Sequence, residues 1–329
     1  MRKVPEPILQ VRNLTVHFYT YAGIVKAIEK VSFDVYKGET FALVGETGCG
    51  KSVTSRAITQ LIESPGRIVE GQVLYYRDDG SVVDLLKLSE EEIRKIRGNE
   101  IAYIFQDPHA SLDPLYTVGY QIAEAMEVHG KIKSIKEGIQ KAVDILKSVL
   151  IPDPARRVNN YPHELSGGMK QRVVIGIGIS NNPRILIADE PTTALDVTIQ
   201  AQILDLLNKM KEKYKATVIL ITHNLGVVAE TADRVAVMYA GKIVEIGTVD
   251  QIFKNPLHPY TQGLLRAVPN PLTKIEKLEA IPGTVPNLIT PPGGCRFHPR
   301  CPKVMSICKE KVPELKEIEP GHFVACHLY

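Results

Sequence analysis

The pattern of apolar and polar positions along the chain predicts strands interleaved with helices. Residues 8–36 alternate apolar and polar side chains, as in ILQVRNLTVHF and VSFDVY, which is the period of half-buried strands. The short apolar runs TFALVG (40–45), RILIAD (184–189) and ATVILIT (216–222) predict buried strands. The segment RVAVMYAGKIVEIG (234–247) predicts a hairpin that turns at Ala240-Gly241.

Helical signals occupy the middle of the chain. Ser89 and Glu92 in LSEEEIRKI form a capping-box pattern that begins a helix, and residues 115–160 are charged and helical in pattern. Proline density rises after residue 255, which predicts a mostly irregular tail, residues 256–329.

Composition narrows the class of protein. The 329 residues suffice for one large domain and a smaller one, and the net charge of +3 is too near neutral to indicate a nucleic-acid binder. The N-terminal MRKVPEPILQVRN has no apolar run after its charges, so we expect no signal peptide. No stretch reaches the ~18 apolar residues of a membrane helix. We therefore expect a cytoplasmic protein, in which disulfides are disfavoured.

A phosphate-binding motif follows the first buried run. GETGCGKS (45–52) fits G-x-x-x-x-G-K-[ST], and a helix is expected to begin near Lys51. Glycines let backbone N–H groups surround phosphate oxygens, and the positive helix end adds to the attraction. Lys51 would reach the β and γ phosphates, and Ser52 would place its hydroxyl on Mg²⁺. Cys49 is interpreted as a small filler residue, not a redox group.

An acidic pair ends the second buried run. Asp189 can hold Mg²⁺ through water, and Glu190 is placed to orient or deprotonate an attacking water. The alternative for such a pair is a plain helix N-cap.

The order of further motifs along the chain indicates which class of nucleotide-binding protein this is. LSGGMKQR (165–172) offers a hydroxyl and exposed N–H groups at a helix start, a second anion site. Gln106 in YIFQDP, Asp196 in TTALD and His223 in LITHN complete the series.

Taken together, residues 8–255 resemble an ATP-binding cassette (ABC) ATPase, with Walker A, Q-loop, signature, Walker B, D-loop and switch histidine in the family's order. The resemblance implies an α/β fold with a RecA-like P-loop core, an N-terminal antiparallel β-subdomain and an inserted helical subdomain at about 107–180. It implies a nucleotide-binding domain over 1–255 and a small C-terminal domain over 256–329. It also implies a head-to-tail dimer that sandwiches two ATP molecules.

Residue roles carry over from the resemblance. Catalysis would fall to Glu190, His223, Gln106 and Lys51, and Mg²⁺ would contact Ser52, Gln106 and Asp189. Ser166, Gly167, Gly168 and Gln171 would act on the partner's ATP, and Asp196 would cross the dimer interface. The residues implied to bind this chain's own ATP are Phe18 or Tyr19, Gly45, Glu46, Thr47, Gly48, Cys49, Gly50, Lys51, Ser52 and Val53.

Two of these assignments have alternatives. Phe18 lies where the family's adenine-stacking aromatic falls and Tyr19 is the near alternative, yet both could simply pack the small sheet. The signature helix contains Gly176 and Gly178, each costing a helix ~1 kcal/mol relative to alanine, and their alternation with isoleucine could instead indicate a strand. We expect these glycines to permit close packing.

The tail narrows the resemblance to one branch. NPLHPYTQGLL and PPGGCRFHPRCP resemble the C-terminal region of ATPases from di- and oligopeptide importers. That branch implies a place at the cytoplasmic face of the membrane, with two membrane permease subunits, a second ABC ATPase subunit and an external peptide-binding protein. Nickel and some sugar importers share the branch. A soluble, non-transport cassette ATPase is disfavoured, because the chain has one cassette and no coiled-coil insertion.

Four cysteines gather in the tail. The spacing Cys295-x5-Cys301-x6-Cys308-x17-Cys326 lacks the close pair typical of structural zinc. Four thiolates suit a [4Fe–4S] cluster, and members of the branch with this cysteine set resemble iron–sulfur proteins in the tail. Zinc, with His298 or His327 as further ligands, and free thiols remain alternatives. We expect a structural staple for the tail, and a redox sensor is the competing hypothesis.

Overall fold

The chain folds as two compact units. The computed structural model describes residues 6–193, 195–267 and 281–329. One unit comprises Met1–Lys87 with Ile221–Tyr329, and the other comprises Leu88–Leu220. The predicted boundary near residue 255 is not tested by this division and stays a prediction.

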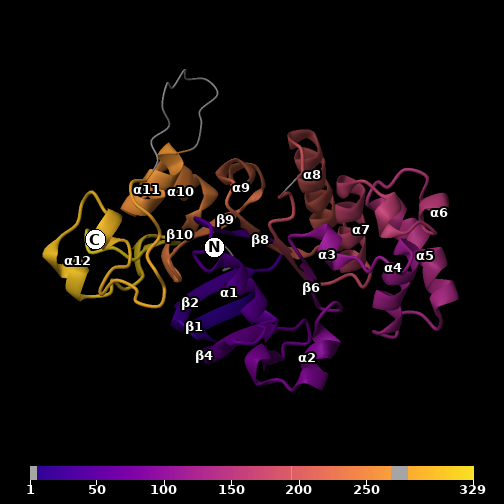
Figure 1. The fold of residues 1–329 in the computed structure, drawn as a ribbon, viewed down its shortest axis with the longest axis horizontal. Helices are drawn as coiled ribbons and strands as arrows, with labels where there is room; N and C mark the ends of the chain where they lie inside the picture. The colour runs from indigo at the N-terminus through magenta and orange to yellow at the C-terminus, as the bar shows by residue number, and fades with distance from the viewer. Residues whose placement is uncertain (1–5, 194, 268–280) are drawn as a thin grey trace. The chain divides into compact units, whose positions relative to one another are not determined.

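An antiparallel sheet begins the first unit (Figure 1). Its strand order is β2-β1-β4-β5, and β1 pairs with both long neighbours, for example Val16 with Ile28 and with Ile68. The strands are β1 (Pro7–Thr20), β2 (Gly23–Tyr36), β4 (Gly66–Tyr76) and β5 (Val82–Asp84). The half-buried strands predicted from the alternation over residues 8–36 are confirmed, and so is the N-terminal antiparallel sheet that the resemblance implied.

A second set of strands in this unit runs in the order β11-β12-β10-β9-β3. Every residue of β3 is buried, and β3 pairs in parallel with β9. The predicted hairpin is confirmed, because β9 and β10 pair antiparallel and Ala240 and Gly241 both have positive φ, as a tight turn requires. The strands are β3 (Thr40–Val44), β9 (Arg234–Tyr239), β10 (Lys242–Thr248), β11 (Lys316–Glu319) and β12 (His322–Val324).

The described part of the tail is mostly irregular, as predicted, but short elements attach it to the sheet. Strand β12 extends the sheet by pairing with β10, and Phe297 is buried against Tyr239 and Tyr260. The helices of this unit are α1 (Lys51–Ile58), α9 (Leu225–Thr231), α10 (Val249–Lys254), α11 (Pro259–Arg266) and α12 (Ser306–Glu310), with 3₁₀ turns η1 (Leu85–Lys87) and η3 (His298–Arg300). Tail and sheet thus share one hydrophobic core.

The second unit combines buried strands with a helical region. Strands β8, β7 and β6 lie in that order, and β6 pairs in parallel with β7. The strands are β6 (Ile101–Ile104), β7 (Ile185–Asp189) and β8 (Thr217–Thr222). The helices are α2 (Glu90–Ile96), α3 (Pro108–Ser111), α4 (Val118–Glu127), α5 (Ile135–Ser148), α6 (Pro154–Arg157), α7 (Gly167–Ile179) and α8 (Val197–Tyr214), with the turn η2 (Pro162–Glu164).

Local sequence signals explain several of these boundaries. The capping box at Ser89 and Glu92 is present at the start of α2, as predicted. Helix α7 forms despite its glycines, and a Cβ added at Gly176 would lie 3.2 Å from Cγ2 of Ile145 on α5. The prediction that a glycine here permits close packing is confirmed. In the described part of the chain, no helix combines the length and apolar character needed to span a bilayer.

Candidate nucleotide-binding site

The phosphate loop lies between β3 and α1 in the first unit. Gly45, Gly48 and Gly50 have φ of 151°, 80° and 105°, values that L side chains rarely adopt. A Cβ at Gly45 would also lie 2.2 Å from the carbonyl oxygen of Met238. The glycines of GETGCGKS are therefore required by backbone geometry.

Lys51 points back into this loop. Its ammonium donates hydrogen bonds to the carbonyl oxygens of Gly45 at 2.9 Å and Glu46 at 3.2 Å, and the residue is 5% exposed. A buried cation held by loop carbonyls is placed to exchange them for phosphate oxygens.

Cys49 is fully buried within the loop. Burial raises the pKa of its thiol, so the neutral form is favoured, while its carbonyl oxygen accepts the N–H of Gly241 at 2.8 Å. This environment fits the interpretation of Cys49 as a small filler and leaves its backbone to define the loop.

The two candidate aromatics differ in environment. Phe18 is half-buried and pairs with Gly66 on β4, where a Cβ would meet its ring at 2.7 Å. Tyr19 is 44% exposed and the guanidinium of Arg67 lies 5.4 Å from its ring centroid. Packing occupies Phe18, whereas Tyr19 presents its ring on the surface.

The acidic pair of the second unit ends β7. Asp189 is 1% exposed and accepts a hydrogen bond from the hydroxyl of Tyr103 at 2.8 Å. Glu190 has φ of 45°, an uncommon conformation for a residue with a side chain. Its Oε2 accepts hydrogen bonds from Gln106 Nε2 and Thr193 Oγ1, both at 2.9 Å. The structure thus brings together the Q-loop glutamine and the Walker B glutamate.

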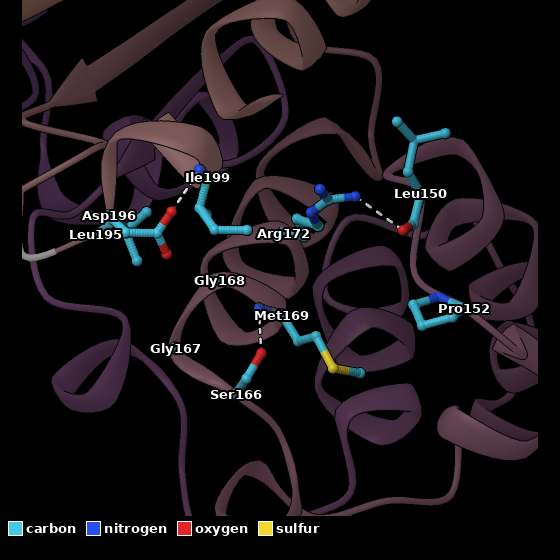
Figure 2. Close-up of a pocket in the computed structure, with 10 residues that line it drawn as sticks. All are labelled: Leu150, Pro152, Ser166, Gly167, Gly168, Met169, Arg172, Leu195, Asp196 and Ile199. Atoms are coloured by element: carbon cyan, nitrogen blue, oxygen red, sulfur yellow. Dashed lines mark hydrogen bonds between the residues drawn. The ribbon is translucent and has the colours of Figure 1, made fainter. Parts of the chain in front are cut away.

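Two helix N-termini border a cavity of about 650 Å³ in the same unit (Figure 2). Ser166 caps α7 by accepting the N–H of Met169, and Asp196 caps α8 by accepting the N–H of Ile199. Arg172 donates to the carbonyl of Leu150 at 2.8 Å. The cavity is lined by Leu150, Pro152, Ser166, Gly167, Gly168, Met169, Arg172, Leu195, Asp196 and Ile199.

The remaining predicted residues do not line this cavity. Gln171 is 1% exposed and does not line it, and its contact with the ATP of a partner subunit stays a prediction. His223 is exposed and directly follows β8.

The tail cysteines lie near one another without forming a recognisable metal site. Burial raises the pKa of Cys295 to about 11, and the nearby thiols of Cys308, Cys326 and Cys301 add to that rise. Among the described residues, no group of three or more His, Cys, Asp or Glu is placed to hold a metal ion. The expected four-cysteine metal site thus has no support from the geometry.

The histidines considered as zinc ligands have other contacts. Nδ1 of His298 lies 3.0 Å from the carbonyl oxygen of Cys295, and Nε2 of His327 lies 2.9 Å from that of Lys311. One ring nitrogen of each histidine is thus engaged by the backbone. The geometry therefore does not favour zinc over iron.

Sequence reasoning missed several supporting residues. Tyr103 contacts Asp189 from the neighbouring strand, and its place two residues before Phe105 in YIFQDP was the available signal. Arg172 ends the signature motif and lines the cavity. Arg300 binds Glu46 of the phosphate loop across 254 residues, for which the sequence offers no signal.

Two known families match successive parts of the chain. The family described as "ABC transporter" matches residues 28–193, and "Oligopeptide/dipeptide transporter, C-terminal region" matches residues 244–308. The dipeptide transport ATP-binding protein DppD of Bacillus subtilis is 51% identical over 98% of this chain and 95% of its own length. DppD of Lactococcus lactis is 50% identical over 97% of this chain and 90% of its own length.

A solved structure agrees with the fold. The dimeric ATP-binding cassette MJ0796, bound to ADP and phosphate, superposes with a TM-score of 0.64 at 29% identity, over 73% of this chain and 98% of that chain. The predicted α/β fold of an ABC ATPase is confirmed. The chain therefore belongs to the ABC transporter family, in the branch of dipeptide and oligopeptide transport ATP-binding proteins.

Proposed function

We propose that this chain is the ATP-hydrolysing subunit of a membrane importer that takes up di- or oligopeptides. The observation that carries the proposal is the match to dipeptide transport ATP-binding proteins over nearly the whole chain, including the tail. Nickel or a sugar is the alternative cargo, and a non-transport ATPase is the less favoured function.

Nucleotide binding is assigned to the phosphate loop and its surroundings. N–H groups of residues 45–53 would surround the phosphates, and Lys51 would exchange the carbonyls of Gly45 and Glu46 for β- and γ-phosphate oxygens. The adenine would stack on an N-terminal aromatic, for which the exposed ring of Tyr19 is better placed than Phe18.

Hydrolysis is assigned to the acidic pair. Mg²⁺, when bound, would neutralise charge that develops on the phosphates. Ser52, Gln106 and Asp189 would hold it, with Tyr103 orienting the buried carboxylate. Glu190 would accept a proton from the attacking water while Gln106 and Thr193 hold its carboxylate. His223 would contact the γ-phosphate and help to hold Glu190.

The signature cavity is assigned to the nucleotide of a second ATPase subunit. Ser166, Gly167 and Gly168 would present the positive end of α7 to its γ-phosphate, and Asp196 would lie at the dimer interface. The assembly would include two permease subunits and an external peptide-binding protein, with this chain at the cytoplasmic face of the membrane.

We also propose that Cys295, Cys301, Cys308 and Cys326 form the metal-binding part of the C-terminal domain. The donor set supports this, because four thiols of one tail suit a [4Fe–4S] cluster. The thiols of Cys301, Cys308 and Cys326 lie near enough to Cys295 to raise its pKa. The measurement is iron and zinc content after purification without oxygen. About four irons per chain would support the cluster, and one zinc per chain would show that zinc takes its place. A protein that holds neither metal would reject the proposal.

Uptake by cells tests the transport function. A strain lacking this chain would be supplied with wild-type protein or the Glu190→Gln variant, and accumulation of labelled dipeptide, oligopeptide, nickel and sugar would be compared. We expect peptide uptake with the wild type only. Restored uptake of nickel or sugar alone would establish the alternative cargo, and no change in any uptake would reject the transport function.

A further inference from the structure

A buried arginine of the tail binds a side chain of the phosphate loop. Arg300 is 9% exposed, and its guanidinium forms two parallel hydrogen bonds with the carboxylate of Glu46, at 2.7 Å and 3.0 Å. Glu46 is the second residue of GETGCGKS, so this contact joins the tail directly to the segment expected to surround phosphate. Bidentate pairs of this kind combine strength with a fixed geometry.

All five N–H donors of the Arg300 guanidinium take part in hydrogen bonds. Nε donates to the carbonyl of Pro282 at 2.9 Å, Nη2 donates to that of Ile281 at 3.2 Å, and Nη1 donates to the hydroxyl of Tyr239 at 3.4 Å. With the two bonds to Glu46, these contacts account for the five donors of an arginine side chain. A lysine has three donors and no planar fork, so it could not reproduce the arrangement.

A second contact fixes the same loop residue. The backbone N–H of Glu46 donates to the hydroxyl of Tyr260 at 2.9 Å. Tyr260 is fully buried, and its ring packs against Tyr239 and Phe297 at centroid distances of 4.7 Å and 5.3 Å. Residues after 255 therefore hold both the main chain and the side chain of Glu46.

The charge of Glu46 gives this contact a consequence for nucleotide binding. A carboxylate in a phosphate-binding loop repels the triphosphate, and the repulsion is greater where solvent screens it poorly. Arg300 neutralises that carboxylate and fixes its position through two hydrogen bonds. Because Lys51 binds the carbonyl oxygen of the same residue, the position of Glu46 also affects the phosphate-binding ammonium.

We propose that Arg300 is a positioning residue for ATP binding, which neutralises Glu46 and fixes the phosphate loop from the tail. This inference rests on the proposed function, since it concerns the same nucleotide site. It assigns to the C-terminal region a direct part in shaping the affinity for ATP.

The test is nucleotide binding by the full chain, measured by titration with ATP and Mg²⁺. Arg300→Gln should weaken binding by about tenfold or more, because it leaves the carboxylate unpaired. Glu46→Gln, which removes the repelling charge, should weaken ATP binding less than Arg300→Gln does. The double variant Glu46→Gln with Arg300→Gln should recover most of the lost affinity, which a purely structural role of Arg300 would not produce.

Controls separate this effect from general destabilisation. Arg234→Gln removes the half-buried partner of Glu39, at the opposite end of β3 from the loop, and should leave ATP affinity unchanged. If Arg300→Gln does not fold, Arg300→Lys decides, and it should also weaken binding. Wild-type affinity in the Arg300 variants, or no recovery in the double variant, overturns the inference. Absence of ATP binding by the wild type would instead reject the proposed function.

Discussion

The amide of Gln106 donates a hydrogen bond to the carboxylate of Glu190 at 2.9 Å, joining a residue that follows β6 to one that follows β7. Parallel pairing of these strands brings their carboxyl ends to one edge, where polar side chains converge. Thr193 donates to the same oxygen, so the carboxylate is held from two sides.

Replacing Glu190 with Gln should abolish hydrolysis while preserving ATP binding. Glutamine retains the shape and hydrogen bonding of the side chain but cannot accept a proton, so we expect a loss of turnover of about 100-fold or more. The variant should also accumulate as an ATP-bound dimer, measured by light scattering after gel filtration. Thr193→Val, which removes one hydrogen bond and no charge, should lose less activity. A normal hydrolysis rate in Glu190→Gln would show that the base is another residue.

Replacing Tyr103 with Phe should weaken Mg²⁺ dependence specifically. The ring keeps its packing against Phe105, at a centroid distance of 4.5 Å, but Asp189 loses the donor that orients its carboxylate. Loss of such an outer contact typically costs about 10- to 100-fold in metal affinity or activity. The measurement is ATPase activity against Mg²⁺ concentration, with ATP binding in EDTA as the control. An unchanged Mg²⁺ midpoint would exclude a role for Tyr103 in orienting Asp189.

Local pattern was sufficient for much of the fold. The alternation of residues 8–36, the apolar runs ending at Val44 and Asp189, and the turn at Ala240-Gly241 each reported a short-range property. The phosphate loop was equally local, because its glycines are demanded by φ values within eight residues.

Long-range contacts were beyond the same reasoning. Periodicity reports which face of a strand is buried and not which strand lies beside it in the sheet. The pairing of β12 with β10 was therefore missed. Nothing near Arg300 in the sequence identifies Glu46 as its partner. The cysteines show the converse, since their number and spacing suggested a metal site that side-chain placement does not support.

The two glycines of α7 predict opposite changes in stability. Alanine favours a helix interior over glycine by about 1 kcal/mol, which both substitutions would gain. A Cβ at Gly178 would make ordinary contacts from 3.4 Å with Ile104, whereas one at Gly176 would press on Ile145 at 3.2 Å. We expect Gly178→Ala to raise the free energy of unfolding and Gly176→Ala to gain less or to lower it. Urea unfolding of both variants measures this, and a larger gain from Gly176→Ala would contradict the packing argument.

The buried His258 should make the fold sensitive to mild acid. Burial lowers its pKa from an ordinary 6.5 to about 3, and the residue is 1% exposed. Its Nδ1 accepts the N–H of Tyr260 at the start of α11, and its own N–H donates to Glu245. The unfolded chain therefore binds a proton below pH 6.5 that the folded chain refuses, and stability present above that pH is lost as the pH falls toward 3. The contribution is about 1.4 kcal/mol per pH unit.

His258→Asn isolates this contribution. Asparagine is a favoured N-cap whose side-chain oxygen can accept the same N–H, but it does not titrate. The free energy of unfolding, measured in urea between pH 7.5 and 5, should fall less steeply for the variant than for the wild type. Equal slopes would mean that other groups cause the acid sensitivity. Because Tyr260 also binds the phosphate loop, ATP affinity at pH 7.5 should be compared in parallel, and the asparagine cap should preserve it.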